Sequence, residues 1–153
     1  MATAHSYGAT VKNNATESEA FLYLASNNIR FKRPIKEERK EILQKLNLPA
    51  SFSRTFDLVY MPEGNDFSVI SEIPVDKLIL VELKTTKKKL TALPDGFFFG
   101  ATDNEFQLAK RLGNQYVFCF VSLHSDSPGY AMLSLEALEK KIKTKRVQYQ
   151  INL

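Results

Sequence analysis

The apolar run from Leu78 to Val81 constrains the fold of this chain more than any other segment, because it has no polar face. A strand that helices cover on both faces is apolar throughout, whereas a half-exposed strand alternates apolar and polar residues. An earlier run, Phe56 to Tyr60, has the same character apart from Asp57. The two runs therefore predict neighbouring central strands of an α/β fold.

Charged residues stand at the ends of these runs, where they are costly unless they are paired or used. Asp57 belongs to the first run, and Glu82 and Lys84 follow the second. Side chains two residues apart on a strand share one face, so Glu82 and Lys84 lie together. This is the layout of a metal-dependent phosphodiesterase. The alternative is that Glu82 and Lys84 form a solvated salt bridge on a surface strand.

The phosphodiesterase interpretation requires a divalent cation. Mg²⁺ prefers oxygen ligands in octahedral geometry and keeps several waters, so one or two carboxylates plus substrate phosphate are its usual setting. Asp57 and Glu82 supply the carboxylates, the Leu83 carbonyl is an additional ligand, and Mn²⁺ is expected to substitute. The metal would lower the pKa of a bound water, and Lys84 would hold that water or the phosphate.

The same residues resemble a known family. Phe56-Asp57-Leu58-Val59 followed by Val81-Glu82-Leu83-Lys84 is similar to the core motif of the PD-(D/E)xK, or restriction-endonuclease-like, superfamily, although the proline of that motif is missing. The segments "VELKTT" and "FFFGATDNEFQLAKRLGNQYVFCFV" resemble a subgroup attached to bacterial restriction and defence proteins and to some plant proteins. The resemblance spans about Thr16 to Lys140, and its central segment is the specific part.

The resemblance implies a restriction-endonuclease-like core, in which helices flank a central mixed β-sheet, and a Mg²⁺-dependent DNA endonuclease that works as a homodimer. It also implies that a glutamate of the first helix approaches the metal. Glu17 is favoured by its spacing, and Glu19 suits helix capping. Either glutamate is also explained as an ordinary acid in the first turn, facing the helix dipole.

The resemblance further places polar residues that contact phosphate or order the water on one face of a later helix. Gln107 and Lys110 or Arg111 occupy that face. Glu105 is expected to cap the helix rather than to bind metal. Phe97 to Phe99 either pack in the core or stack on an unpaired base.

The charge of the chain suits an anionic partner such as double-stranded DNA without requiring one. Lys and Arg total 21 and Asp and Glu total 17, which gives a net charge of +4. Basic residues gather in three regions: Arg30, Lys32, Arg33, Lys36, Arg39 and Lys40; Lys84, Lys87, Lys88 and Lys89; and Lys140, Lys141, Lys143, Lys145 and Arg146. Such clusters are usually solvated faces. Only the second follows the candidate catalytic lysine, so Lys87, Lys88 and Lys89 are predicted to contact nucleic acid.

Length and composition fit one domain over residues 1–153, with residues 1–14 loose. A chain of 153 residues that is 44% hydrophobic can bury a core without disulfides. The sequence contains no signal-peptide core and no run of about 18 apolar residues. A cytoplasmic protein without a membrane partner is therefore expected.

Local patterns predict the remaining elements. Capping boxes at Thr16-Glu17-Ser18-Glu19 and at Thr102 to Glu105 begin helices that end at Asn27-Asn28 and at Gly113. Further helices are expected over Lys36 to Leu46 and, after Ser134, over Leu135 to Lys143. Further strands are expected over Phe67 to Ile70, Gln115 to Leu123, Tyr130 to Leu133 and Arg146 to Asn152, with turns at residues 62–65 and 94–96. The stretch from Thr85 to Phe99 is expected to be a mobile loop beside the site.

A second function remains open on the same residues. A catalytically silent domain would keep the fold and the charge as a nucleic-acid-binding or protein-binding module. The sequence leaves open whether the substrate is DNA or RNA. Because the chain is short, target specificity would come from dimerisation or from a partner protein.

Overall fold

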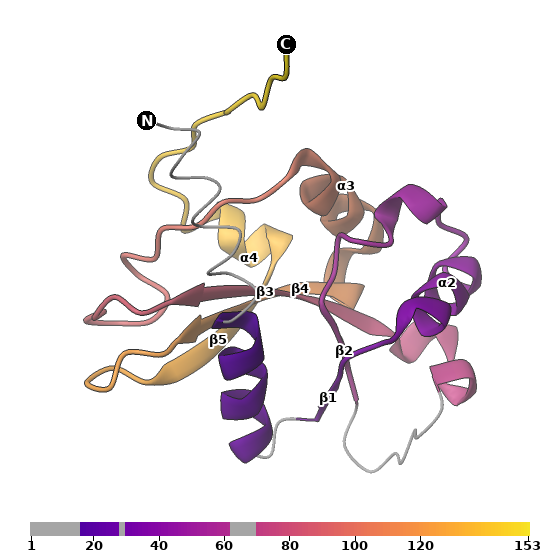
Figure 1. Cartoon of the computed structure of the whole chain (residues 1–153), viewed down its shortest axis with the longest axis horizontal. Helices are drawn as coiled ribbons and strands as arrows, with labels where there is room; N and C mark the ends of the chain where they lie inside the picture. Colours follow the sequence, from indigo (N-terminus) through magenta and orange to yellow (C-terminus); the bar gives the residue numbers. More distant parts are fainter. Residues whose placement is uncertain (1–15, 28–29, 62–69) are drawn as a thin grey trace.

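The computed structural model describes residues 16–27, 30–61 and 70–153, which form an α/β structure around a five-stranded mixed sheet (Figure 1). The strands are β1 (Phe31–Lys32), β2 (Leu58–Tyr60), β3 (Ile79–Thr86), β4 (Tyr116–Ser122) and β5 (Gly129–Ser134). They lie in the sheet in sequence order. β1, β2 and β3 are antiparallel to one another in turn, β4 is parallel to β3, and β5 is antiparallel to β4.

Helices cover both faces of this sheet. They span residues 16–26, Lys36–Lys45 (α2), Asp103–Leu112 (α3) and Leu135–Glu139 (α4). Single 3₁₀ turns are η1 (Ala50–Phe52), η2 (Ile70–Glu72), η3 (Val75–Lys77) and η4 (Gly113–Gln115). The helix over 16–26 lies on one face, and α3 and α4 lie on the other (Figure 1). Because parallel strands need a long crossover, α3 belongs to the connection between β3 and β4.

The alternation of side chains along β3 divides the core between the two faces. Val81 and Leu83 pack with Ala20 and Leu24 of the first helix. Leu80 points to the opposite face, into the larger cluster that contains Leu43 of α2, Leu108 of α3, Phe118 of β4 and Leu135 of α4. Glu82 and Lys84 follow the period of Leu80, so their side chains lie on the same face as α3.

The start of α3 is set by the local sequence, as predicted. The Thr102 hydroxyl accepts a hydrogen bond from the backbone N–H of Glu105, and the Glu105 carboxylate accepts one from the backbone N–H of Thr102. This reciprocal capping box satisfies two donors that a helix start otherwise leaves unpaired. The helix ends at Gly113, whose φ of 56° lies in the left-handed region that glycine tolerates.

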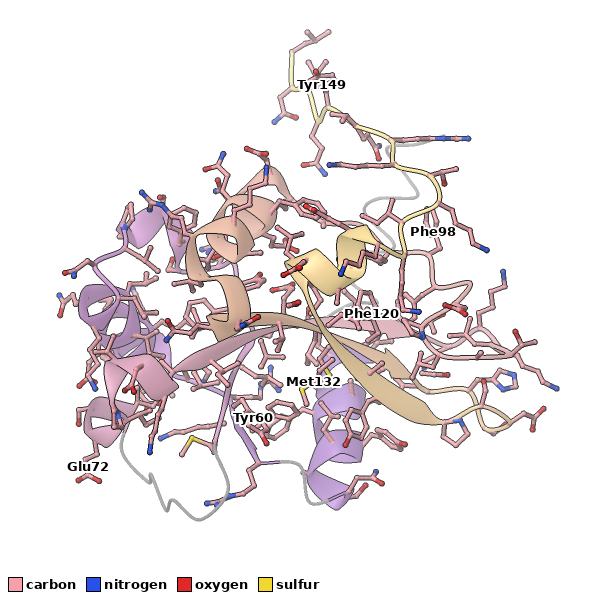
Figure 2. The ribbon with its side chains drawn as sticks, turned by 180° about the vertical axis from the view of Figure 1, so that it is seen from behind. Tyr60, Glu72, Phe98, Phe120, Met132 and Tyr149 are labelled. Carbon is pink, nitrogen blue, oxygen red and sulfur yellow. The ribbon has the colours of Figure 1, made fainter. Side chains whose placement is uncertain are left out.

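Four sequence predictions are wrong, and the first is the start of the loop expected at Thr85, because β3 continues through Thr86. The residues from Arg146 to Asn152 form no strand, and Val147, Tyr149 and Ile151 are 74%, 80% and 76% exposed. Figure 2 shows Tyr149 on a segment that projects from the body of the molecule. A strand needs a hydrogen-bonded neighbour, and no described segment pairs with this one. The helix after Ser134 ends at Glu139 rather than Lys143, and Ile70 lies in η2 rather than in a strand.

Other predictions concern residues that the structure does not describe: the loose start at 1–14, the turn at 62–65 and positions 67–69 of the expected strand. Within the described ranges, no helix is both long and apolar enough to cross a membrane.

Candidate active site

The junction of β2 and β3 brings Asp57 and Glu82 together. The ladder ends where Leu58 pairs with Val81, and the Asp57 N–H also donates to the Val81 carbonyl, at 2.8 Å. Asp57 therefore lies against the Val81–Glu82 part of β3, close enough for its charge to raise the pKa of Glu82. Asp57 stands just before β2 rather than inside it. Its Oδ2 accepts a hydrogen bond from the Leu83 N–H at 2.7 Å, which fixes the carboxylate at the edge of β3.

Lys84 lies between two carboxylates. Its Nζ is 2.7 Å from Oε1 of Glu105 and 3.5 Å from Oε1 of Glu82. The second oxygen of Glu105 accepts from the Thr102 hydroxyl at 2.8 Å, so Glu105 caps α3 and orients Lys84 at once. Sequence analysis identified only the cap. An acidic residue in the first turn of the crossover helix was the available signal, because that helix packs on the face to which Glu82 and Lys84 point.

Burial and mutual repulsion set the ionisation of the two candidate ligands. Loss of solvation, followed by the charge of Asp57, raises the pKa of Glu82 to about 10. Loss of solvation also raises the pKa of Asp57, against the hydrogen bond from Leu83. Burial lowers the pKa of Lys84, but Glu82 and Glu105 outweigh it, so the net pKa is raised. In the metal-free protein Glu82 is therefore protonated at neutral pH, and Lys84 carries its charge.

The protonation of Glu82 predicts how stability depends on pH. Between its ordinary pKa of 4.5 and its folded pKa of about 10, the folded chain holds a proton that the unfolded chain has lost. The contribution of Glu82 to the free energy of unfolding is therefore full below pH 4.5, and it decreases as the pH rises from 4.5 to about 10. In EDTA, urea unfolding should show the free energy of unfolding decreasing from pH 5 towards pH 9. Glu82→Gln should flatten this slope, and an equally steep slope in that variant would contradict the assignment.

The donor set fits Mg²⁺ or Mn²⁺. Glu82 is only 8% exposed, and no N–H or hydroxyl group in the described part of the chain donates a hydrogen bond to its buried Oε2, which leaves the Asp57 carboxyl as the neighbour that the Glu82 carboxyl faces. The N–H and C=O of one strand residue point to the same side, so the Leu83 carbonyl faces Asp57 as its N–H does. Residues 16–27, 30–61 and 70–153 contain no group of three or more His, Cys, Asp and Glu side chains placed for a metal. Two carboxylates and a carbonyl are nevertheless enough for an ion that keeps several waters.

The two glutamates of the first helix occupy different surroundings. Burial, and then the charge of Asp57, raises the pKa of Glu17, which places this carboxylate within electrostatic reach of the site. Glu17 also lines a cavity of ≈ 230 Å³ together with Leu83, Lys84 and Phe98. Glu19 points elsewhere, and its Oε1 is 3.5 Å from Nζ of Lys87. Of the two candidates, only Glu17 is positioned to approach a metal held by Asp57 and Glu82.

The predicted nucleic-acid contacts are exposed and lie outside the carboxylate cluster. Lys87, Lys88 and Lys89 follow β3, where Lys87 contacts Glu19 and Lys89 is 3.7 Å from Oδ2 of Asp126. On α3, Gln107 donates to Asp103, and the Arg111 guanidinium lies 5.7 Å from the centre of the Phe52 ring. No described contact joins Gln107, Lys110 or Arg111 to Asp57, Glu82 or Lys84.

The three consecutive phenylalanines divide between packing and solvent. The rings of Phe97 and Phe99 each lie 5.0 Å from that of Phe120, centre to centre, in edge-to-face contact. Phe98 between them is 93% exposed and lies at the cavity shared by Glu17 and Lys84. Core packing therefore accounts for Phe97 and Phe99 and leaves Phe98 available to a ligand.

Sequence reasoning missed the role of Arg39, a residue of α2 that holds the Asp57 segment in place. Its guanidinium donates to the carbonyls of Ser53 at 3.0 Å, Phe56 at 2.5 Å and Asp57 at 3.3 Å. It also lies over the Phe56 ring, 4.9 Å from the ring centre. The only signal in the sequence was a cation on a helix that precedes β2, and many helices carry one.

Comparison of the chain with protein-family models, with curated proteins and with solved structures found no match. A functional assignment for this chain therefore depends on the chemistry of Asp57, Glu82, Lys84 and their neighbours.

Proposed function

We propose that this protein is a Mg²⁺-dependent endonuclease that hydrolyses phosphodiester bonds of DNA. One observation carries the proposal: the buried Glu82 and the half-buried Asp57 form a carboxyl pair beside a lysine that a third carboxylate orients. A structural ion pair would not need Asp57, because Glu105 already pairs with Lys84 at 2.7 Å. The repulsion between two adjacent acids is relieved by a proton, which Glu82 holds in the metal-free protein, or by a cation that replaces this proton.

The mixed sheet with helices on both faces supports a restriction-endonuclease-like core as the finer description of the fold. In such a core Asp57, Glu82 and the Leu83 carbonyl would hold the metal, with Glu17 approaching it directly or through water. A bound Mg²⁺ supplies a water of lowered pKa and neutralises charge on the phosphate.

The chain's own side chains provide the remaining steps. Lys84, held by Glu105, donates a hydrogen bond to the attacking water or to a phosphate oxygen and so orients the nucleophile. Glu82 must lose its proton as the metal binds, so metal affinity should rise with pH. Glu82 is buried and the Lys84 side chain is only 11% exposed, which limits the competition of bulk water for their interactions.

The experiment that tests the proposal is cleavage of supercoiled plasmid DNA. The purified protein should nick or linearise the plasmid in Mg²⁺ or Mn²⁺ and should be inactive in EDTA. A matched RNA substrate decides between the two nucleic acids. Failure of Mg²⁺ or Mn²⁺ to support cleavage of either polymer would exclude the nuclease.

The alternative function is a silent module that binds nucleic acid or protein through the same fold. The protonated state of Glu82 favours it in one respect, because a neutral Glu82 beside a Lys84–Glu105 pair is stable without metal. Mg²⁺ binding separates the two functions before any cleavage assay. A module has no reason to gain thermal stability from millimolar Mg²⁺, whereas a metal site does.

Assembly and location stay proposals that follow from the endonuclease. Cutting both strands favours a homodimer, or a partner protein that brings the domain to its target. The cytoplasm, expected from the sequence patterns, is the proposed place of action.

Lys87, Lys88 and Lys89 provide a separate test of nucleic acid as the substrate. Replacing all three with Ala should weaken binding about equally for unrelated duplexes, because phosphate contacts carry no sequence information. The slope of log K against log salt should flatten by roughly 0.9 for each phosphate that is no longer neutralised by a lysine. Lys87 and Lys89 are already partly neutralised by Glu19 and Asp126, so we expect the slope to flatten by the equivalent of about one to two phosphate contacts rather than three. An unchanged slope measured by fluorescence anisotropy would mean that this cluster is a solvated face.

A further inference from the structure

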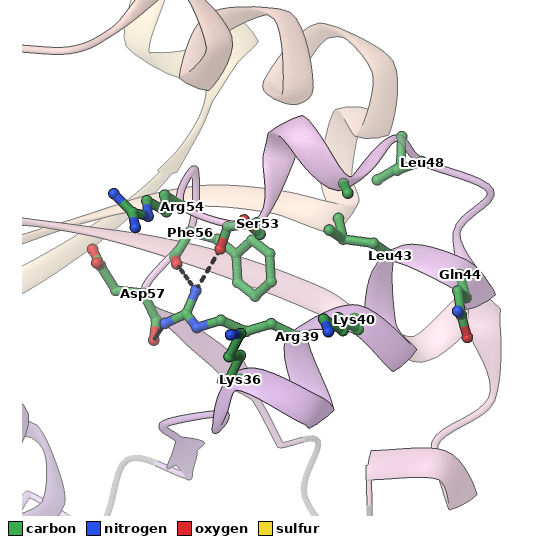
Figure 3. Close-up of a pocket in the computed structure, with 11 residues that line it drawn as sticks. Lys36, Arg39, Lys40, Leu43, Gln44, Leu48, Ser53, Arg54, Phe56 and Asp57 are labelled. Carbon is green, nitrogen blue, oxygen red and sulfur yellow. Dashed lines mark hydrogen bonds between the residues drawn. The ribbon is translucent and has the colours of Figure 1, made fainter.

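A larger cavity lies beside Asp57, between α2 and the segment that follows η1. It measures ≈ 720 Å³, within the range of roughly 300–1,000 Å³ that small-molecule sites occupy. Lys36, Arg39 and Lys40 come from α2, and Arg54 and Asp57 come from the chain after η1 (Figure 3).

The charge of this cavity is strongly unbalanced. Four of its lining residues are cations, and Asp57 is the single acid among them. Arg39 is committed to the carbonyls of Ser53, Phe56 and Asp57 (Figure 3). Lys36, Lys40 and Arg54 are exposed, and no carboxylate in the described part of the chain lies within 4.0 Å of any of them. Three such cations around one cavity raise the local concentration of anions.

The same cavity has an apolar wall, which a site for a bare inorganic anion would not need. Leu43 and Phe56 are buried beneath it, and Leu48 lies at its side (Figure 3). Arg39 covers the Phe56 ring, so the guanidinium plane and the leucines together offer a surface to a flat, weakly polar group. A ligand that combines a phosphate with a planar ring, as a nucleotide does, matches both parts of the cavity.

Asp57 belongs to this cavity and to the carboxylate cluster. We propose that the cavity between α2 and η1 binds the nucleotide that adjoins the scissile phosphodiester, with Lys36, Lys40 and Arg54 contacting its phosphate and with Leu48 and the face of the Arg39 guanidinium contacting its base or sugar. This inference rests on the proposed function, because it treats the ligand as part of the substrate strand. In this arrangement α2 positions the nucleic-acid strand, while the residues at β2 and β3, Asp57, Glu82 and Lys84, take part in the cleavage.

The test measures binding without cleavage. In EDTA, thymidine 5′-monophosphate, thymidine and inorganic phosphate are each titrated into wild type, Lys36→Ala/Arg54→Ala and Lys77→Ala/Lys143→Ala. The last variant removes the same charge from exposed lysines outside the cavity. We expect the nucleotide to bind wild type more tightly than either fragment. The cavity variant should bind the nucleotide about tenfold or more weakly than wild type, and the nucleotide affinity of the control should stay within about twofold of wild type. On single-stranded DNA, the slope of log K against log salt should flatten in the cavity variant by roughly 0.7 for each phosphate contact that is lost.

The outcomes test the nucleotide site and the nuclease activity independently of each other. Equal nucleotide affinity of wild type and the cavity variant, or an equal decrease in the control, overturns the cavity as a nucleotide site. Tighter binding of inorganic phosphate than of nucleotide overturns the role of the apolar wall. If the plasmid assay fails while the cavity variant loses nucleotide affinity, the nuclease is excluded and the nucleotide site stands. If cleavage persists with an unchanged KM in the cavity variant, the cavity proposal fails alone. Circular dichroism of both variants checks that these exposed substitutions leave the fold intact.

Discussion

Replacing Lys84 with Met is expected to lower the rate of Mg²⁺-dependent cleavage by at least about 10³-fold, since a side chain that orients the reacting groups contributes on this scale. Met keeps the length of the aliphatic stem and removes the ammonium. Saturating DNA isolates kcat, and the affinity for DNA should change little, because one buried lysine makes few backbone contacts. A single-turnover assay with pre-bound DNA measures this decrease directly.

The surroundings of Lys84 add a second expected effect of the same substitution. The lysine neutralises Glu105 at 2.7 Å, in a site where both side chains are mostly buried. Removing one partner of a buried pair leaves the other uncompensated, so the free energy of unfolding should fall by about 2–4 kcal/mol at pH 7. Stability and rate must therefore be measured at a temperature where the variant is fully folded.

Glu105→Gln is the matched control for Lys84→Met. The amide oxygen of Gln can still accept from Thr102, so the cap of α3 is kept while the ion pair is removed. Cleavage should fall by about tenfold through misplacement of Lys84, much less than in Lys84→Met. Wild-type cleavage by Lys84→Met would show that the nuclease activity arises elsewhere, and equal rates in both variants would show that the ion pair, rather than the ammonium, matters.

Asp57→Asn is expected to abolish cleavage and to weaken Mg²⁺ binding by at least about tenfold, because it removes a ligand charge from the metal. The amide oxygen of Asn can still accept the Leu83 N–H, so the junction of β2 and β3 should remain intact. Isothermal titration with Mg²⁺, and the rise in Tm that Mg²⁺ produces, measure the decrease in affinity.

Asp76→Asn provides the control for Asp57→Asn. Asp76 is an exposed acid of η3, and its substitution removes the same charge from the chain. It should leave Mg²⁺ affinity and cleavage at wild-type values. If Asp57→Asn cleaves DNA as fast as Asp76→Asn, the carboxylate pair is structural and the silent module becomes the better description.

The sequence alone determined the elements whose patterns are local. The unbroken apolar run before Glu82 gave β3 and its burial, because only a strand covered on both faces can lack polar residues. The spacing of Thr102 and Glu105 gave the start of α3, since a capping box is complete within four residues. The period of two along β3 also placed Glu82 and Lys84 on one face.

Tertiary structure decided whatever depends on contacts between distant segments. Three interactions of the site join residues that are 17 to 26 positions apart in the sequence. They are the ion pair of Lys84 with Glu105, the hydrogen bond from the Leu83 N–H to Asp57, and the hydrogen bond from Arg39 to the Phe56 carbonyl. The spacing favoured Glu17 over Glu19, but only the packing of the first helix showed that Glu17 lies near Asp57 and that Glu19 contacts Lys87. The alternating segment from Arg146 to Asn152 shows the converse, because a strand pattern without a neighbour to pair with forms no strand. Periodicity fixes which side a residue faces, but which residues meet depends on how the elements pack together.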